Sequence, residues 1–241
     1  HHEITVIDNR FISERVNQIR NWNMEFIQGD ILDKNFISPY LKDADIVHHL
    51  AGITKVPRTK SESSEAHDKK IKEVGEIGTQ NILDIVSDKC KIIFPSTHVV
   101  YEGVNEVKTD IKEHEDTKPI LSYSSSKAVN EQQLKESGKN YIILRLGSVY
   151  GYSTDTARID IMPNLFSKIS SQNGTLKLFS GGRQLKSLVP LIDVARCFKF
   201  MEERNDLSSE TFNLVKDTLT VKKVAEICKK YNPKITLKET N

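Results

Sequence analysis

Short runs rich in isoleucine, valine and phenylalanine alternate along this chain with longer amphipathic stretches. Five such runs are EITVID, MEFIQGD, ADIVHHLAG, CKIIFPST and NYIILRLGSVYG, and each ends in small or polar residues. The stretches between them, residues 33–41, 65–87 and 124–137, have helical patterning. Alternation of strand and helix predicts an α/β fold in which a doubly wound parallel sheet carries helices on both faces.

The regular alternation ends near Gly151. Beyond it, helices are expected at about 163–170, 193–203 and 221–231, and short strands at LKLF and ETFNLV. We therefore expect a main-sheet domain over residues 1–151. A smaller, mixed α/β region over residues 152–241 should pack beside it, with some of its segments returning to the main sheet.

Composition narrows the class of protein. The net charge of +2 over 241 residues is too small to indicate nucleic acid binding, and no apolar run approaches the 18 residues of a membrane span. The first ten residues lack the layout of a signal peptide. Cys90, Cys197 and Cys228 are far apart and show neither metal-ligand nor disulfide spacing. A cytoplasmic protein without a metal site is expected.

In open parallel sheets, ligands bind beyond the carboxyl ends of the strands. Asp8 ends the first apolar run, where a carboxylate can accept the ribose hydroxyls of adenosine and repel a 2′-phosphate, which favours NAD over NADP. Asp30 and Ile31 follow the second run, where the acid could meet an adenine amino group. The small residues around Ala51 would allow a dinucleotide close approach. Asp8 could equally be a turn residue, and Asp30, taken alone, more often is one.

The stretch LSYSSSKAVNEQQL places Tyr123 and Lys127 four residues apart, which is one helical turn. A nearby ammonium favours the phenolate form of a tyrosine, which could then accept a proton from a sugar hydroxyl. Thr97, at the end of the fourth run, could donate to the same substrate oxygen. Taken alone, this spacing more often marks an exposed tyrosine and lysine at the start of a helix.

Together, the motifs resemble those of the extended short-chain dehydrogenase/reductase family, in its NAD-dependent nucleotide-sugar epimerase/dehydratase branch. The motifs that carry this resemblance are VIDN, GDILD, HHLAG, GTQNILD, FPSTHVVYE, YSSSK, LRLGSVYG and GGRQLKSLVPLIDVARC. The resemblance implies a Rossmann-like fold and three catalytic residues, Thr97, Tyr123 and Lys127. The cofactor-binding residues that it implies are Asp8, Asn9, Asp30, Ile31, Leu50, Ala51, Gly52, Ser96, Tyr123 and Lys127. The substrate-binding residues that it implies are Thr97, Ser148 and Lys186, and it places Thr79 and Asn81 near the active-site strand.

Several positions depart from the family pattern. No glycine-rich GxxGxxG turn precedes Asp8, so we expect about 20 or more residues, with a first strand and this turn, ahead of His1. Glu102 stands where the family has glycine after VY. His98 and Val99 follow Thr97, whereas the 4,6-dehydratases of the family that this chain resembles usually carry Asp-Glu at these two positions. Because neighbouring strand residues point to opposite faces, His98 is expected to point away from the site.

Two substitutions concern the substrate. Ser148 replaces the asparagine that usually meets the sugar or its diphosphate, and Lys186 replaces an arginine of the nucleotide-wrapping segment. A lysine keeps the charge but loses the bidentate fork of arginine. The glutamate that decarboxylating relatives tend to carry near the site is also absent from this sequence.

These observations favour an NAD-dependent 4-epimerase of nucleotide-diphosphate sugars, which would work through a 4-keto intermediate. A nucleotide-sugar ketoreductase and a non-catalytic binding module on the same fold are the alternatives. By resemblance, the segments 65–87 and 124–137 should pair with their copies as a four-helix bundle in a homodimer. Neither nucleic acid nor membrane is expected as a partner.

Overall fold

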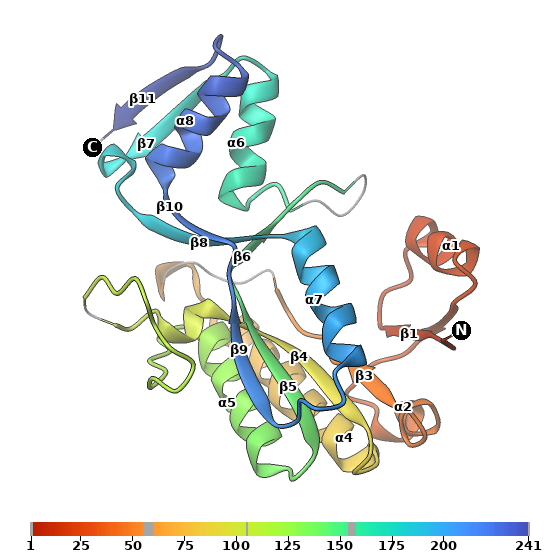
Figure 1. Cartoon of the computed structure of the whole chain (residues 1–241). Helices are drawn as coiled ribbons and strands as arrows, with labels where there is room; N and C mark the ends of the chain where they lie inside the picture. Colours follow the sequence, from red (N-terminus) through yellow and green to blue (C-terminus); the bar gives the residue numbers. More distant parts are fainter. Residues whose placement is uncertain (1, 55–59, 105, 154–157, 241) are drawn as a thin grey trace.

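The computed structural model describes residues 2–54, 60–104, 106–153 and 158–240. A four-stranded parallel sheet lies at its centre, in the order β3-β4-β5-β9 (Figure 1). Its strands are β3 (Ile46–His48), β4 (Lys91–Thr97), β5 (Asn140–Leu146) and β9 (Glu210–Leu214). The last of these comes from the C-terminal region, so the chain returns to the main sheet after leaving it.

Helices cover both faces of the central sheet (Figure 1). The helices concerned are α2 (Lys34–Leu41), α4 (Gly78–Ile85) and α5 (Ser122–Glu136) on one face and α7 (Leu191–Glu203) on the other. Residues along β4 alternate between two cores, because Phe94 packs with the first set of helices and Ile93 packs with α7. The predicted doubly wound arrangement is therefore confirmed for these strands.

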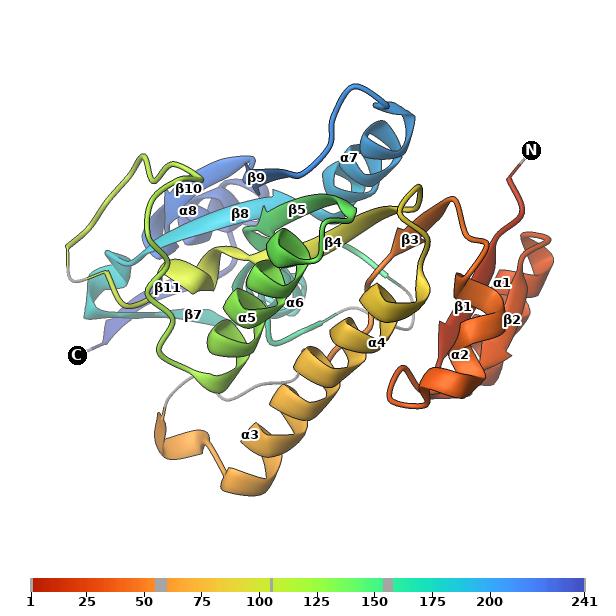
Figure 2. The same ribbon diagram turned by 90° about the horizontal axis from the view of Figure 1, so that it is seen from below.

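Strands β1 (Thr5–Asp8) and β2 (Glu25–Gln28) form a parallel sheet of their own, joined by α1 (Ser13–Asn21) (Figure 2). Within the described residues β1 does not pair with β3, so the five apolar runs do not join one sheet. Side chains of α4 hold the segment that follows β2 instead. Lys34 Nζ lies 2.7 Å from Asp84 Oδ2, and Asn81 Nδ2 donates to Ile31 O at 2.9 Å.

The helix expected over residues 65–87 contains a π-helical turn. It runs as α3 (Glu65–Lys72), the π segment η2 (Glu73–Ile77) and α4, and it lies beside α5 (Figure 2). A π segment usually occurs as a single turn inside an α-helix, and α5 holds this one by two hydrogen bonds: Asn130 donates to Gly75 O at 3.0 Å and Gln133 to Glu76 O at 2.9 Å. A Cβ on Gly75 would lie 2.3 Å from Ser126 Oγ, so this close approach requires glycine.

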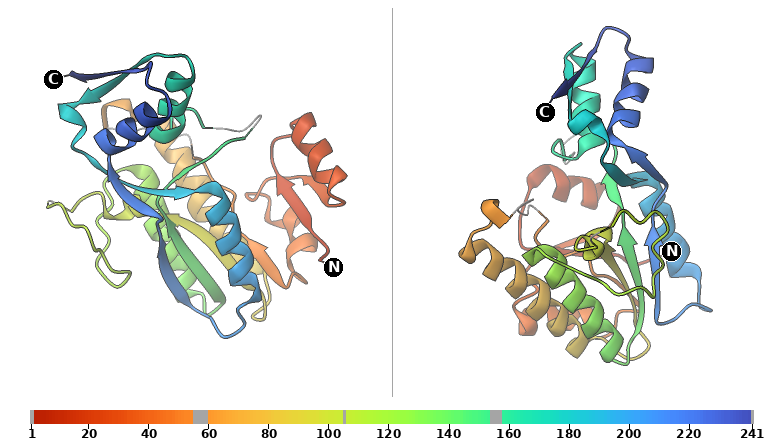
Figure 3. Two further views of the ribbon diagram at one scale, coloured as in Figure 1. Left: turned by 45° about the horizontal axis from the view of Figure 1, so that its top comes forward. Right: turned by 90° about the vertical axis from the view of Figure 1, so that its left-hand side faces the viewer.

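The C-terminal region contributes a second, smaller unit (Figure 3). Its elements are β6 (Ser148–Tyr150), α6 (Met162–Ser171), β7 (Thr175–Phe179), β8 (Leu185–Pro190), β10 (Asp217–Thr220), α8 (Val221–Tyr231) and β11 (Thr236–Thr240). They form sheets of order β10-β8-β6 and β11-β7 over a separate apolar core that includes Phe166 and Leu176. Among the described residues, no helix is both long and apolar enough to cross a membrane.

Candidate active site

The catalytic pair predicted from spacing lies on α5, next to the carboxyl end of β4. Tyr123 and Lys127 are both on α5, one turn apart. The Lys127 ammonium donates to Pro95 O at 2.9 Å and lies 4.2 Å from the centroid of the Phe94 ring. Both contacts are on β4, so this lysine is fixed to the strand that ends in Thr97.

Thr97 is the last residue of β4 and is 8% exposed. Its Oγ1 accepts a hydrogen bond from Val99 N at 3.3 Å and thereby caps the short helix η3 (His98–Tyr101). This bond uses a lone pair and leaves the hydroxyl proton for a different acceptor. A substrate oxygen at the end of β4 would suit that proton.

Burial sets the protonation behaviour of the pair. Burial lowers the pKa of Lys127 to about 8, although the negative charge of Glu131 acts in the opposite direction and raises that pKa. Burial also raises the pKa of the Tyr123 phenol, and the positive charge of Arg158 partly opposes this. The lysine is thus near its titration point at neutral pH, whereas the tyrosine needs added positive charge before it can ionise.

A buried histidine, His49, lies beside Phe94, the residue whose ring the Lys127 ammonium contacts. His49 follows β3, and its Nε2 is 2.8 Å from Thr79 Oγ1. Its ring packs on Phe94, with centroids 5.3 Å apart. Burial, reinforced by the charge of Lys127, lowers the pKa of His49 to about 3, so the imidazole stays uncharged at neutral pH. His49 belongs to the HHLAG motif, whose small residues predicted a cofactor contact but whose histidines carried no such signal.

The acids predicted to meet adenosine come together at the carboxyl ends of β1 and β2. Asp8 accepts from Arg10 N at 2.8 Å, and its side chain remains 47% exposed. Asn9 Nδ2 donates to Asp30 Oδ2 at 3.1 Å, and Asp30 Oδ1 accepts from Leu32 N at 3.0 Å. Parallel pairing of the two strands explains this juxtaposition.

The remaining expected cofactor residues divide into exposed and packed positions. Leu50 is 61% exposed after β3, Ala51 is half-buried, and a Cβ on Gly52 would meet only open space. Ile31 instead packs on α4, since a Cβ on Gly78 would come within 2.2 Å of its Cδ1. The exposed positions therefore follow β3, whereas Ile31 belongs to the packing between the β2–α2 connection and α4.

Ser96 points to the opposite side of β4 from Thr97, as strand alternation requires. Its hydroxyl donates to Glu131 Oε1 at 2.5 Å. Glu131 also forms a buried ion pair with Arg145, with Nη2 2.6 Å from Oε2. The structure thus places Ser96 in a polar cluster beneath the catalytic pair, between α5 and the sheet.

Two of the three expected substrate residues, Ser148 and Lys186, lie on the neighbouring strands β6 and β8. Ser148 begins β6 and is in register with Leu188 of β8, two residues after the exposed Lys186. His98 was expected to alternate away, but β4 ends at Thr97, so strand alternation no longer applies to it. Its Nδ1 lies 2.9 Å from Leu146 O at the end of β5. Burial lowers the pKa of His98, and the charge of Lys186 contributes to the lowering.

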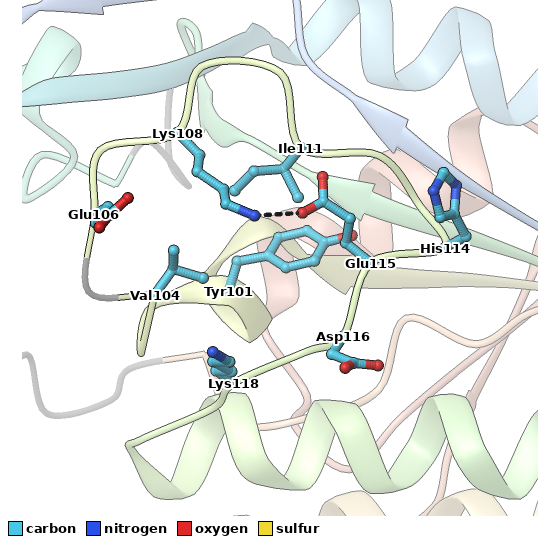
Figure 4. Close-up of a pocket in the computed structure, with 9 residues that line it drawn as sticks. All are labelled: Tyr101, Val104, Glu106, Lys108, Ile111, His114, Glu115, Asp116 and Lys118. Atoms are coloured by element: carbon cyan, nitrogen blue, oxygen red, sulfur yellow. Dashed lines mark hydrogen bonds and ion pairs between the residues drawn. The ribbon is translucent and has the colours of Figure 1, made fainter.

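A cavity of about 500 Å³ lies apart from the predicted catalytic, cofactor and substrate residues, within the connection between η3 and α5 (Figure 4). Tyr101 forms part of its wall, and Lys108 and Glu115 pair across it at 2.7 Å. None of the residues predicted to bind cofactor or substrate lines it. The carboxyl ends of the central strands therefore remain the candidate site.

The fold and the paired Tyr123 and Lys127 define an enzyme of the short-chain dehydrogenase/reductase type. The sequence pattern of the NAD dependent epimerase/dehydratase family matches residues 1–214, and the chain belongs to that family. A UDP-N-acetyl-alpha-D-glucosaminuronate decarboxylase of Bacillus cytotoxicus is 27% identical over 236 residues, which cover 93% of this chain and 71% of that protein.

Solved structures share the fold at lower identity. A UDP-glucose 4-epimerase of Thermotoga maritima, solved with UDP-glucose, is 22% identical, has a TM-score of 0.79, and matches 100% of this chain and 79% of its own. A UDP-glucuronic acid 4-epimerase of Bacillus cereus, in complex with UDP-glucuronic acid and NAD, is 22% identical and has a TM-score of 0.79. The match covers 99% of this chain and 78% of that protein chain. A dTDP-glucose 4,6-dehydratase of Bacillus anthracis, in complex with NAD, is 18% identical and has a TM-score of 0.80. The match covers 99% of this chain and 76% of that protein chain.

Proposed function

We propose that this chain catalyses 4-epimerisation of a nucleotide-diphosphate sugar through a 4-keto intermediate. The observation that carries the proposal is the attachment of Lys127 to Pro95 O, which sets the catalytic helix against the strand end that bears Thr97. Tyr123 then occupies the adjacent turn of the same helix. A base, a cation and a hydroxyl donor are brought to one end of the sheet.

The residues present fit NAD. The exposed carboxylate of Asp8 can accept the two hydroxyls of an adenosine ribose, and Asp30 lies beside it through Asn9. An ammonium has three N–H donors; one from Lys127 goes to Pro95 O, and the others suit a nicotinamide ribose. When bound, NAD would accept a hydride from the sugar carbon and give it back.

The protein residues handle the proton. Tyr123, as phenolate, takes the proton of the sugar 4-hydroxyl while the C4–H bond breaks, which leaves a ketone. Thr97 donates to the same oxygen, and the charge of Lys127 stabilises the phenolate. Return of the proton from Tyr123 to the oxygen restores the alcohol. Reduction on the other face of the sugar gives the 4-epimer with no net consumption of cofactor.

The 27% identical decarboxylase supports a second candidate, decarboxylation of a nucleotide-linked uronate. Oxidation at C4 of a uronate makes a β-keto acid, in which the C5–carboxylate bond breaks to release CO₂ and leave an enolate. The same three residues would serve this first oxidation. A net ketoreductase differs in consuming reduced cofactor, and a binding module differs in giving no product.

Incubation of the full-length protein with UDP- and dTDP-sugars, followed by NMR, tests these possibilities. Epimerisation yields the C4 diastereomer, decarboxylation yields CO₂ and a pentose, and reduction consumes NADH. Tyr123→Phe should lower turnover by about 100- to 10,000-fold, because it removes the acid–base group. Tyr231→Phe, on the 83% exposed Tyr231 of α8, is the matched control. Equal turnover in both variants would exclude the assigned role of Tyr123.

Assembly and location complete the proposal. Ile77 is 51% exposed and Val129 is 41% exposed on the adjoining helices η2 and α5, which supports a homodimer through this surface. Light scattering at micromolar concentration tests it. The free thiols of Cys90, Cys197 and Cys228 support a cytoplasmic location, since a reducing compartment keeps cysteines unpaired.

A further inference from the structure

Glu102 connects the end of the catalytic strand to the start of the catalytic helix. It follows η3, and its Oε1 accepts from Ile120 N and Leu121 N, both at 2.8 Å. The same oxygen accepts from the hydroxyl of Ser124. One carboxylate oxygen thus has three donors, all within three residues of Tyr123.

The first turn of α5 needs such a partner. Its N-cap position is Leu121, whose side chain has no hydrogen-bond acceptor. The helix N-terminus carries partial positive charge, which a carboxylate stabilises. Ser124 Oγ lies 2.9 Å from Leu121 O and 3.2 Å from Leu121 N, so it joins Glu102 to the cap. Glu102 therefore fixes the two residues that lead into α5 and, through the Ser124 hydroxyl, its first turn, and it accepts from neither of the amides that a capping side chain would use.

The backbone on either side of Glu102 is also fixed. Gly103 N donates to Lys118 O at 2.8 Å, and Lys118 N donates to Val100 O at 2.7 Å, which closes the intervening loop at its base. On the other side of η3, Thr97 Oγ1 accepts from Val99 N. A short path of hydrogen bonds therefore runs from Thr97 through Glu102 to the turn that bears Tyr123.

We propose that Glu102 is a positioning residue that sets the Tyr123 turn of α5 relative to Thr97. The proposal deepens the assigned function and rests on it. The motif that this stretch resembles has glycine at this position, and glycine offers no carboxylate. Misplacement of a reacting group by about 1 Å can cost about 100-fold in rate, which makes the contact measurable.

The experiment compares Glu102→Ala with Glu102→Gln in the full-length protein. Glu102→Ala removes the acceptor, so we expect kcat to fall about 10- to 100-fold with KM changed less than about 3-fold. Backbone amides of residues 120–126 should exchange with deuterium at least about 10-fold faster, because their turn opens more often. Glu102→Gln keeps an acceptor oxygen and should recover most of both properties.

Glu115→Ala is the matched control. Glu115 is a carboxylate of the same connection that accepts from Lys112 N at 2.9 Å and pairs with Lys108, both within the loop (Figure 4). Its loss should leave kcat and the exchange of residues 120–126 unchanged. A fall in kcat as large as that of Glu102→Ala would mean that loop stability alone matters, and would overturn the proposal.

Hydrogen exchange and turnover test the Glu102 contact and the proposed function separately. Wild-type exchange at residues 120–126 in Glu102→Ala, or kcat within about 2-fold of wild type, overturns the positioning role. If no nucleotide sugar is turned over, the proposed function fails, while faster exchange in Glu102→Ala still supports the Glu102 contact. Should Glu102→Ala not fold, Ser124→Ala removes one of the three donors, and faster exchange at 120–126 supports the contact while unchanged exchange overturns it.

Discussion

The ion pair of Arg145 and Glu131 is buried between α5 and the central sheet, with side chains 2% and 3% exposed. Glu131 accepts from Arg145 Nη2 at 2.6 Å and Nε at 3.0 Å, and from Ser96 Oγ at 2.5 Å. Glu131→Gln keeps the size of the side chain but leaves the guanidinium buried without a counter-charge. Removing one partner of such a pair costs about 3–5 kcal/mol, and we expect this loss in the free energy of unfolding.

Glu131→Gln should also change the pKa of Lys127, the proposed catalytic lysine. Glu131 is one turn beyond Lys127, and its charge raises the pKa of Lys127, whereas burial lowers that pKa to about 8. Without the carboxylate the ammonium loses its proton at a lower pH. Urea unfolding measures the stability term, and the alkaline limb of the kcat/KM profile, which should move to lower pH, reports the lysine.

Glu136→Gln serves as the control, because Glu136 is an exposed carboxylate on the same helix that accepts from Gln132. Surface substitutions of this kind usually change stability by less than about 0.5 kcal/mol. If Glu131→Gln lost less than about 1 kcal/mol and left the pH profile in place, the buried pair would be neither a stabilising contact nor an electrostatic support for Lys127.

Two further outcomes follow from the site. Because burial lowers the pKa of Lys127 to about 8, the charged form dominates below that pH, and kcat/KM should fall as pH rises through it; a flat profile up to pH 10 would contradict this. Asp8→Ala should reduce the preference for NAD over NADP by about 10-fold or more, since a carboxylate facing a 2′-phosphate repels it by up to about 4 kcal/mol at an effective dielectric of 20. Equal dissociation-constant ratios for wild type and variant would rule out Asp8 as the ribose partner.

The sequence was most informative where the signal is local. Runs of branched apolar residues located the parallel strands, and the four-residue spacing located Tyr123 and Lys127 on one helix. The strand-end position of Thr97 followed from the same reading, because the apolar run stops there. Such features depend on neighbours in the chain, which is why propensity and periodicity suffice to find them.

Contacts between distant residues escaped the sequence reasoning. The bond from Ser124 to Glu102 spans 22 residues, and that between His49 and Thr79 spans 30. No spacing rule joins such pairs, since the loops between them can take many paths. His98 shows a related limit: strand alternation does not apply to its side chain, because the strand ends at Thr97. The separation of β1 from β3 likewise depends on pairing that no single segment determines.

The π turn of η2 gives the helix over residues 65–85 a built-in phase shift. Each α-helical residue rotates the chain by about 100°, so one extra residue per turn redirects everything after it. Thr79 and Asn81 face His49 and Ile31 only because this rotation has already happened. Deletion of one residue within η2 would close the π turn into a regular α-helix, and the residues after it would keep the faces that they present now.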